Sequence, residues 1–225
     1  MIGLFDPLFW MLVGPFFVVG MIAQIWVKSA YASAQRRAAP LSGAAAARHI
    51  LDSAGLQNVD IQAVPGHLSD HYDPRHKVLR LSQQVYQSQS LAAVGIAAHE
   101  AGHAIQDARA YAPLVIRNLA VPAAGFGSNA SFLLIILGIV FSWPAILWLG
   151  VGLFGCVVFF QLVNLPVEFN ASRRAKAQLA QLGIVDSQGM VYVNSVLNAA
   201  AMTYVAALLQ AVMTLLYYII IARRR

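Results

Sequence analysis

The feature that most constrains the fold is a set of apolar runs long enough to cross a lipid bilayer. About 20 helical residues span the ~30 Å hydrocarbon core of a membrane. Residues 8–27 form one such run, residues 128–167 are long enough for two crossings joined by a turn at 142–144, and residues 199–222 form the last. Hydrophobic residues make up 59% of the chain and charged residues 11%, which excludes an ordinary soluble domain. We therefore predict a mainly α-helical membrane protein with about four transmembrane helices.

The distribution of Lys and Arg predicts the orientation, because basic residues beside membrane spans favour the cytoplasmic side. Lys28 and Arg36 follow the first run, and Arg173 and Arg174 follow the third. The polar segments should therefore face the cytoplasm from the inner (plasma) membrane. A fourth full crossing would leave the basic tail at 223–225 outside, so either the tail tolerates that side or the last run does not fully cross. The net charge of +6 fits this topology and anionic lipid headgroups, and no nucleic-acid motif accompanies it.

The polar segment at 28–115 is predicted to be a small mixed fold. Its elements, in chain order, are a helix over 43–54 capped by Ser42, a strand over 59–64, a turn over 70–74, a strand over 78–81 and a helix over about 90–107. Helix, strands and a metal-binding helix occur in this order in the catalytic half of zincin peptidases, where an edge strand can hold an extended peptide. We therefore expect a small cytoplasmic zincin-like α+β catalytic segment.

The last of these helices carries the sequence His-Glu-Ala-Gly-His. His99 and His103 are one helical turn apart and share a face, so both rings can reach one metal ion. Glu100 lies beside them in the place of a general base that takes a proton from water held by zinc. A catalytic zinc site uses three protein ligands. Glu168 is the only other glutamate, and it either supplies the third ligand or pairs with the arginines that follow it.

Two further residues are weaker candidates for contact with a substrate or its oxyanion. His71 lies just before the second strand, although a turn or surface role is the plainer interpretation. Tyr204 lies in the last apolar run, where a tyrosine more often anchors a helix at the membrane interface.

Several separated stretches carry a family resemblance: residues 70–74, 79–82, 97–106, 165–169 and 197–206. In these stretches the chain resembles the YugP-like neutral zinc metallopeptidases and, more distantly, HtpX-type membrane proteases. The resemblance implies Zn²⁺ bound by His99, His103 and Glu168, with Glu100 as the catalytic residue of a gluzincin-like metallopeptidase.

The chain departs from the HtpX-like pattern at Ser172. An aspartate often stands at this position, four residues after the glutamate ligand, and orients a zinc-bound histidine. A different partner is then expected to fix that ring. Asn170, Asn198 and Asp107 are the candidates, and the sequence does not rank them.

These observations predict a membrane-embedded zinc endopeptidase that cleaves unfolded or membrane-associated proteins at the cytoplasmic face. Its partners would be a polypeptide substrate and the lipid bilayer, and the oligomeric state is left open. The expected organisation is a first transmembrane helix at 1–27, the zincin-like segment at 28–115, a transmembrane hairpin at 116–167, a cytoplasmic helix with the third ligand at 168–198, and a last transmembrane helix with a basic tail at 199–225.

Two other classes of protein remain as alternatives. A zinc-binding membrane scaffold without proteolytic activity would normally close its metal site with four protein ligands, and the sequence offers three good ones. A small transporter should carry ionisable residues inside its membrane spans, and these runs have essentially none.

Overall fold

The computed structural model describes residues 6–67 and 69–224, and the chain divides into two compact units. The first unit consists of Met1–Ala23, Val115–Pro166 and Thr203–Arg225. The second consists of Gln24–Leu114 and Val167–Met202. The start of the first expected span, residues 1–5, and the last residue of the basic tail lie outside the described residues.

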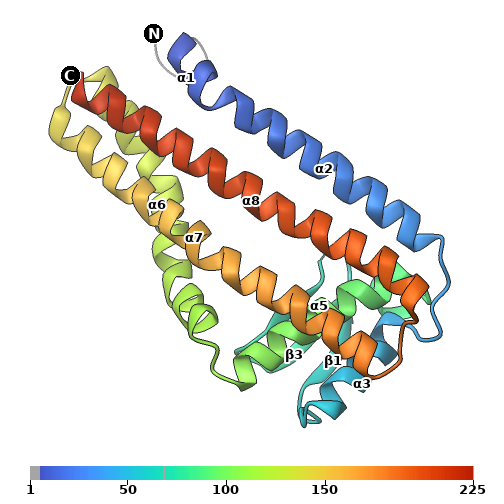
Figure 1. Ribbon diagram of the computed structural model, residues 1–225. Coiled ribbons are helices and arrows are strands. Elements are labelled where there is room, and N and C mark those ends of the chain that lie inside the picture. Colours follow the sequence, from blue (N-terminus) through green and yellow to red (C-terminus); the bar gives the residue numbers. More distant parts are fainter. Residues whose placement is uncertain (1–5, 68, 225) are drawn as a thin grey trace. The chain divides into compact units, whose positions relative to one another are not determined.

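Long helices form most of the chain (Figure 1). They are α2 (Gly14–Gln35), α6 (Ala112–Val140), α7 (Pro144–Gln181) and α8 (Ser187–Arg223), preceded by the short α1 (Pro7–Leu12). Within the described ranges, these four long helices are apolar enough to cross a membrane. The expectation of a mainly helical protein is therefore confirmed, and these four helices are candidates for the expected membrane spans.

The helices α7 and α8 are longer than a membrane crossing requires. At 1.5 Å per residue, the 38 residues of α7 extend about 57 Å, nearly twice the thickness of the hydrocarbon core. The segment expected as one helix over 168–198 consists instead of the end of α7, a turn and the beginning of α8. Gly183 lies in that turn with φ +62°, a backbone conformation that favours glycine.

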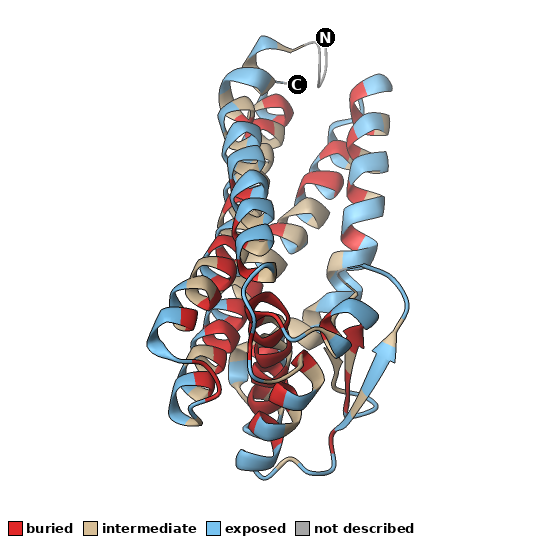
Figure 2. Cartoon of the chain, turned by 90° about the vertical axis from the view of Figure 1, so that its right-hand side faces the viewer, coloured by how far each residue is buried: buried red, intermediate tan, exposed pale blue. Residues whose placement is uncertain are grey.

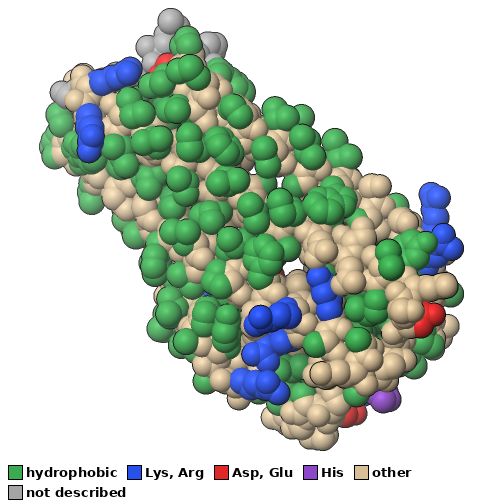
Figure 3. Space-filling model, viewed as in Figure 1, with side chains coloured by type: hydrophobic (Ala, Val, Ile, Leu, Met, Phe, Trp, Pro, Cys, Tyr) green, Lys and Arg blue, Asp and Glu red, His purple; other side chains and the backbone are tan. Residues whose placement is uncertain are grey.

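The first unit has a core at the turn between α6 and α7. Ser142 adopts φ +51° in this turn, and the chain reverses before Pro144 begins α7. A Cβ atom added at Gly138 would lie 2.5 Å from the backbone nitrogen of Leu147, so the two helices pack closely here. The phenol of Tyr217 in α8 is fully buried and donates a hydrogen bond to the Asp6 carboxylate (3.0 Å). In Figure 3, most of the side chains coloured by type on the visible face of the first unit are hydrophobic, as expected of helices that face lipid.

The second unit contains a small sheet whose strand order is β1–β3–β2. β1 (Asp60–Val64) pairs in parallel with β3 (Val78–Ser82), and β2 (His71–Asp73) pairs antiparallel with β3. The structure places β2 where the sequence indicates a turn, because a strand of three residues is too short to show an alternating pattern. The edge strand β2 lies against the helix α5 (Leu91–Ala108).

The core of the second unit forms around α5. The side chain of Ser90 caps this helix by accepting a hydrogen bond from the backbone N–H of Ala93 (3.2 Å). Most of α5 is buried, and Figure 2 draws most of it red. Its many alanines and glycines let neighbouring elements approach closely, among them α3 (Gly43–Ser53), which begins after the Ser42 cap as expected. Burial of α5 fixes the positions of the side chains that it carries.

Candidate metal centre

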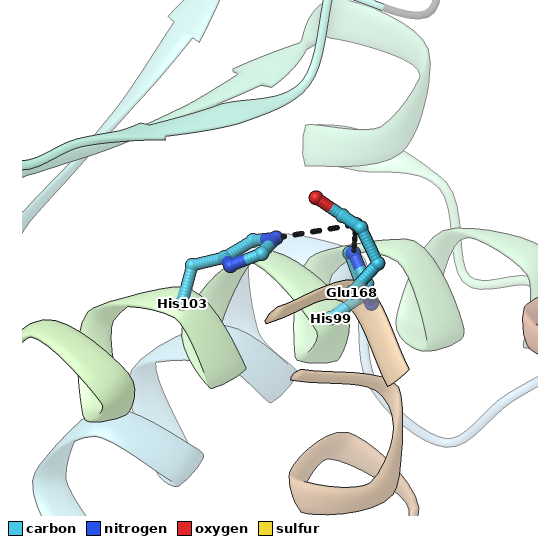
Figure 4. A group of neighbouring side chains, drawn as sticks. All are labelled: His99, His103 and Glu168. Carbon is cyan, nitrogen blue, oxygen red and sulfur yellow. Dashed lines mark hydrogen bonds and ion pairs between the residues drawn. The ribbon is translucent and has the colours of Figure 1, made fainter. Parts of the chain in front are cut away.

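Two histidines of α5 and one glutamate of α7 converge in the second unit. The Nε2 atom of His99 lies 3.2 Å from the Oε2 atom of Glu168, and the Nε2 atom of His103 lies 3.6 Å from the same oxygen. All three potential ligand atoms lie within 4.8 Å of one another. Figure 4 shows both rings directed at the Glu168 carboxylate. The structure therefore brings together the three residues that the sequence indicates as metal ligands.

The dimensions of this group fit a zinc ion. Imidazole nitrogens and carboxylate oxygens bind zinc at about 2.0–2.2 Å, so two ligands in tetrahedral geometry are about 3.4 Å apart. The two distances to the Glu168 oxygen lie on either side of that value. Two nitrogens and one oxygen would leave a fourth position open, as catalytic zinc sites do.

The position of Glu168 depends on a close contact between α5 and α7. Gly102 stands one residue before His103, and a Cβ atom added there would lie 2.7 Å from the backbone oxygen of Ala171. Ala171 is one helical turn after Glu168 and is fully buried. Glycine at 102 therefore allows α7 to bring its carboxylate to the two histidines.

Replacing Gly102 by Ala should separate the two helices. We expect the free energy of unfolding to fall by about 1–3 kcal/mol, because the new methyl group meets buried backbone that cannot yield easily. Denaturation in mixed micelles would measure this change. Gly152→Ala in α7 is the matched control, since an added Cβ there meets nothing within 4 Å. Equal stability of the two variants would contradict the proposed role of the close contact.

Each histidine ring has a second partner on its other nitrogen. The Ser172 hydroxyl lies 3.1 Å from Nδ1 of His99, and Oε1 of Gln106 lies 3.0 Å from Nδ1 of His103. Such contacts fix the orientation and tautomer of a ligand histidine. The expectation that another residue replaces Ser172 is therefore wrong, because the serine hydroxyl itself reaches the ring that an aspartate would orient.

The three residues named as candidate partners have other roles. Asn170 contacts Gln106 rather than a histidine, Asn198 accepts a hydrogen bond from Lys176 (2.6 Å), and Asp107 accepts one from the Tyr72 phenol (2.8 Å).

Sequence reasoning missed Gln106, which is fully buried. Its amide nitrogen donates to the backbone oxygen of Val167 (2.8 Å) and to the side-chain oxygen of Asn170 (3.0 Å), while its amide oxygen faces His103. Gln106 thus connects a candidate ligand to the part of α7 that carries Glu168. Its signal in the sequence is a glutamine three positions after His103, on a helix whose preceding residues are small or apolar apart from His99, Glu100 and His103.

Replacing Gln106 by Leu should weaken metal binding without removing a ligand. Loss of such a supporting hydrogen bond typically lowers metal affinity 10- to 100-fold. The buried groups left without a partner should also lower the free energy of unfolding by about 1–3 kcal/mol. Competition with a fluorescent zinc chelator would measure the affinity. The control is Gln188→Leu, at an exposed glutamine of α8, and a metal affinity as high in Gln106→Leu as in this control would contradict the assigned role.

The Glu100 carboxylate is positioned by the edge strand. Its Oε2 atom accepts a hydrogen bond from the backbone N–H of Tyr72 in β2 (3.1 Å). Removal from water raises the pKa of Glu100 to about 7, an effect that the nearby His99 opposes and the Glu168 carboxylate reinforces. A carboxyl group with such a pKa can both accept and release a proton near neutral pH.

The two weaker candidates lie in different units. His71 is exposed in β2, and its Nδ1 atom lies 2.8 Å from the backbone oxygen of Ser69, so that nitrogen carries a proton. Tyr204 is partly buried in the portion of α8 that belongs to the first unit. Their proposed contact with substrate stays a prediction.

Comparisons with known proteins agree with a membrane peptidase. The model of the family described as "Putative neutral zinc metallopeptidase" matches residues 9–223. The "Putative membrane protease YugP" of Bacillus subtilis (strain 168) is 44% identical over 180 residues, which cover 80% of each chain. No solved structure matches the chain. The family match over nearly the whole chain and the identity to this relative show that the protein belongs to the neutral zinc metallopeptidase family.

Proposed function

We propose that this protein is a membrane-embedded zinc-dependent endopeptidase that hydrolyses peptide bonds of unfolded or membrane-associated proteins at the cytoplasmic membrane face. The observation that carries the proposal is the convergence of His99, His103 and Glu168, with Glu100 beside them on the same helix. The family and the membrane protease relative support the same class of activity.

His99, His103 and Glu168 would hold the zinc ion in this proposal. Zinc bound there would acidify a water molecule and polarise a carbonyl group. Glu100 is the proton acceptor, because its carboxylate has a pKa near neutrality and is held by the Tyr72 backbone. The same carboxyl group can then give its proton to the leaving amine, so Glu100 acts first as a base and then as an acid.

The edge strand β2 is a candidate for holding the substrate. An extended peptide can add to an exposed strand edge through main-chain hydrogen bonds. β2 lies at one edge of the sheet and its Tyr72 N–H faces Glu100, so a peptide along this edge would pass beside the proposed base. His71 of the same strand, with Nδ1–H donating to Ser69, could offer a second N–H to a substrate oxygen as the imidazolium. Tyr204 remains the other candidate for such a contact.

The proposed organisation assigns residues 1–27, 116–167 and 199–225 to the membrane, with the basic tail at the chain end. Residues 28–115 and 168–198 then form the zincin-like catalytic part. The distribution of Lys and Arg supports a cytoplasmic location for this part, in the plasma membrane.

Cleavage of an unfolded protein tests the activity. Detergent-purified protein with zinc should cleave casein, detected as new amino termini, and should leave a tightly folded protein of similar size uncut. Cleavage of neither casein nor an unfolded protein tethered to the same membrane, despite bound zinc, would favour the zinc-binding scaffold over the peptidase.

Thiol labelling tests the orientation. A single cysteine placed at the exposed Arg75, in a Cys156→Ser background, should resist a membrane-impermeant thiol reagent in intact cells and react in inverted membrane vesicles. Labelling in intact cells would place the catalytic part outside and contradict the proposed location.

A further inference from the structure

Three arginines of the second unit gather without a carboxylate partner. Arg109 directly follows α5, and Arg173 and Arg174 lie on α7; we call these three residues the arginine cluster. Burial and, after it, the positive charges of Arg109 and Arg173 lower the pKa of Arg174, so both charges lie near its guanidinium group. Among the residues that the structure describes, none of them forms an ion pair with Asp or Glu. Like charges gathered in this way are stabilised by a bound anion.

The guanidinium group of Arg174 is held in place. Its Nε atom donates to the side-chain oxygen of Asn170 (2.7 Å), and the group lies over the Tyr111 ring, 6.0 Å from its centre. Asn170 is buried and is itself fixed by the amide of Gln106. Within the described chain, no hydrogen bond uses the two Nη groups of Arg174. A fixed guanidinium with free Nη groups suits the oxygens of a phosphate, which arginine can bind through two parallel hydrogen bonds.

The surroundings of the arginine cluster point to a lipid. Along α7, the exposed apolar side chains Phe159, Leu162 and Phe169 precede Arg173, and the last of them stands about one turn before it. Tyr111 directly precedes α6, which is apolar enough to cross a membrane. A change from exposed apolar residues to arginine, with a tyrosine beside it, is typical of the level of the lipid headgroups. Figure 3 shows Lys and Arg side chains side by side where α5 and α7 lie in Figure 1.

We propose that Arg109, Arg173 and Arg174 bind the phosphate of an anionic phospholipid headgroup. Arg174 provides the fixed hydrogen-bond donors, and the exposed Arg109 and Arg173 add positive charge beside it. Binding of this kind is independent of the proposed peptidase activity, since it uses none of the candidate metal ligands or Glu100.

Native mass spectrometry of the detergent-solubilised protein tests this site. The wild type should bind phosphatidylglycerol more tightly than phosphatidylcholine with the same acyl chains. Each arginine removed should weaken phosphatidylglycerol binding about fivefold. The double variant Arg109→Gln/Arg173→Gln should therefore bind roughly 25-fold more weakly, with an unchanged thermal unfolding midpoint because neither side chain is buried. The triple variant with Arg174→Gln should lose the preference for the anionic lipid.

The control removes the same number of charges elsewhere. Lys28→Gln/Arg36→Gln/Arg75→Gln changes three exposed, dispersed residues and should leave the preference for phosphatidylglycerol intact. Equal weakening in the control and triple variants would show diffuse attraction rather than a site and would overturn the proposal. Displacement of the lipid by inorganic phosphate at a similar concentration would assign the cluster to a soluble anion and would also overturn it.

Discussion

Replacing Glu100 by Gln is expected to lower kcat for peptide hydrolysis by about 10³-fold, within the range that general acid–base groups contribute, and to leave zinc content unchanged. The amide keeps the size of the side chain, and its oxygen can still accept the Tyr72 N–H. It cannot take a proton from water or return one to the leaving amine. Initial rates of casein cleavage and zinc content should be measured on the same samples.

The control for this variant is Asp52→Asn, at a half-exposed carboxylate of α3 that pairs with Arg48. It removes the same charge and should cleave at the wild-type rate. A fully active Glu100→Gln protein would exclude Glu100 as the general base.

The second large effect is expected from loss of a ligand. His103→Ala and Glu168→Ala should each reduce zinc content to the level of the buffer and abolish cleavage, because two protein ligands hold zinc far more weakly than three. Metal analysis after gel filtration would measure the loss. His49→Ala, at an exposed histidine of α3, should retain both zinc and activity.

The glutamate variant separates two roles of Glu168. The carboxylate contacts both histidines, and without a metal this contact is an ordinary pairing of imidazole with carboxylate. Loss of zinc in Glu168→Ala supports the ligand role. Zinc retained at wild-type affinity would show that Glu168 only pairs with the rings and would leave the third ligand to be found elsewhere.

The sequence predicts the elements whose signals are local. The Ser42 cap of α3 and the one-turn spacing of His99 and His103 each act within a single helix. The contact of Glu168 with the two histidines joins parts of the chain that are distant in sequence. It could still be anticipated because the chain has only one other glutamate, so few arrangements could complete the ligand set.

Other parts of the site depend on packing that sequence patterns do not carry. β2 is too short to show a strand pattern, yet its Tyr72 backbone holds Glu100. Gln106 becomes a partner of His103 only because both lie buried beside α7. The apolar run in the sequence begins only at residue 128, because the polar Arg117 and Pro122 interrupt the pattern before it. In the structure the helix α6 begins at Ala112 and contains Pro122.

The hypothesis that one zinc ion held by His99, His103 and Glu168 supports hydrolysis is tested most directly by returning zinc to metal-depleted protein. Bound zinc and the initial rate of casein cleavage should be recorded on the same samples at each step. We expect the rate to rise in proportion to bound zinc and to level off when each chain holds a single ion. A rate that does not depend on bound zinc, or that keeps rising beyond one ion per chain, would contradict this account.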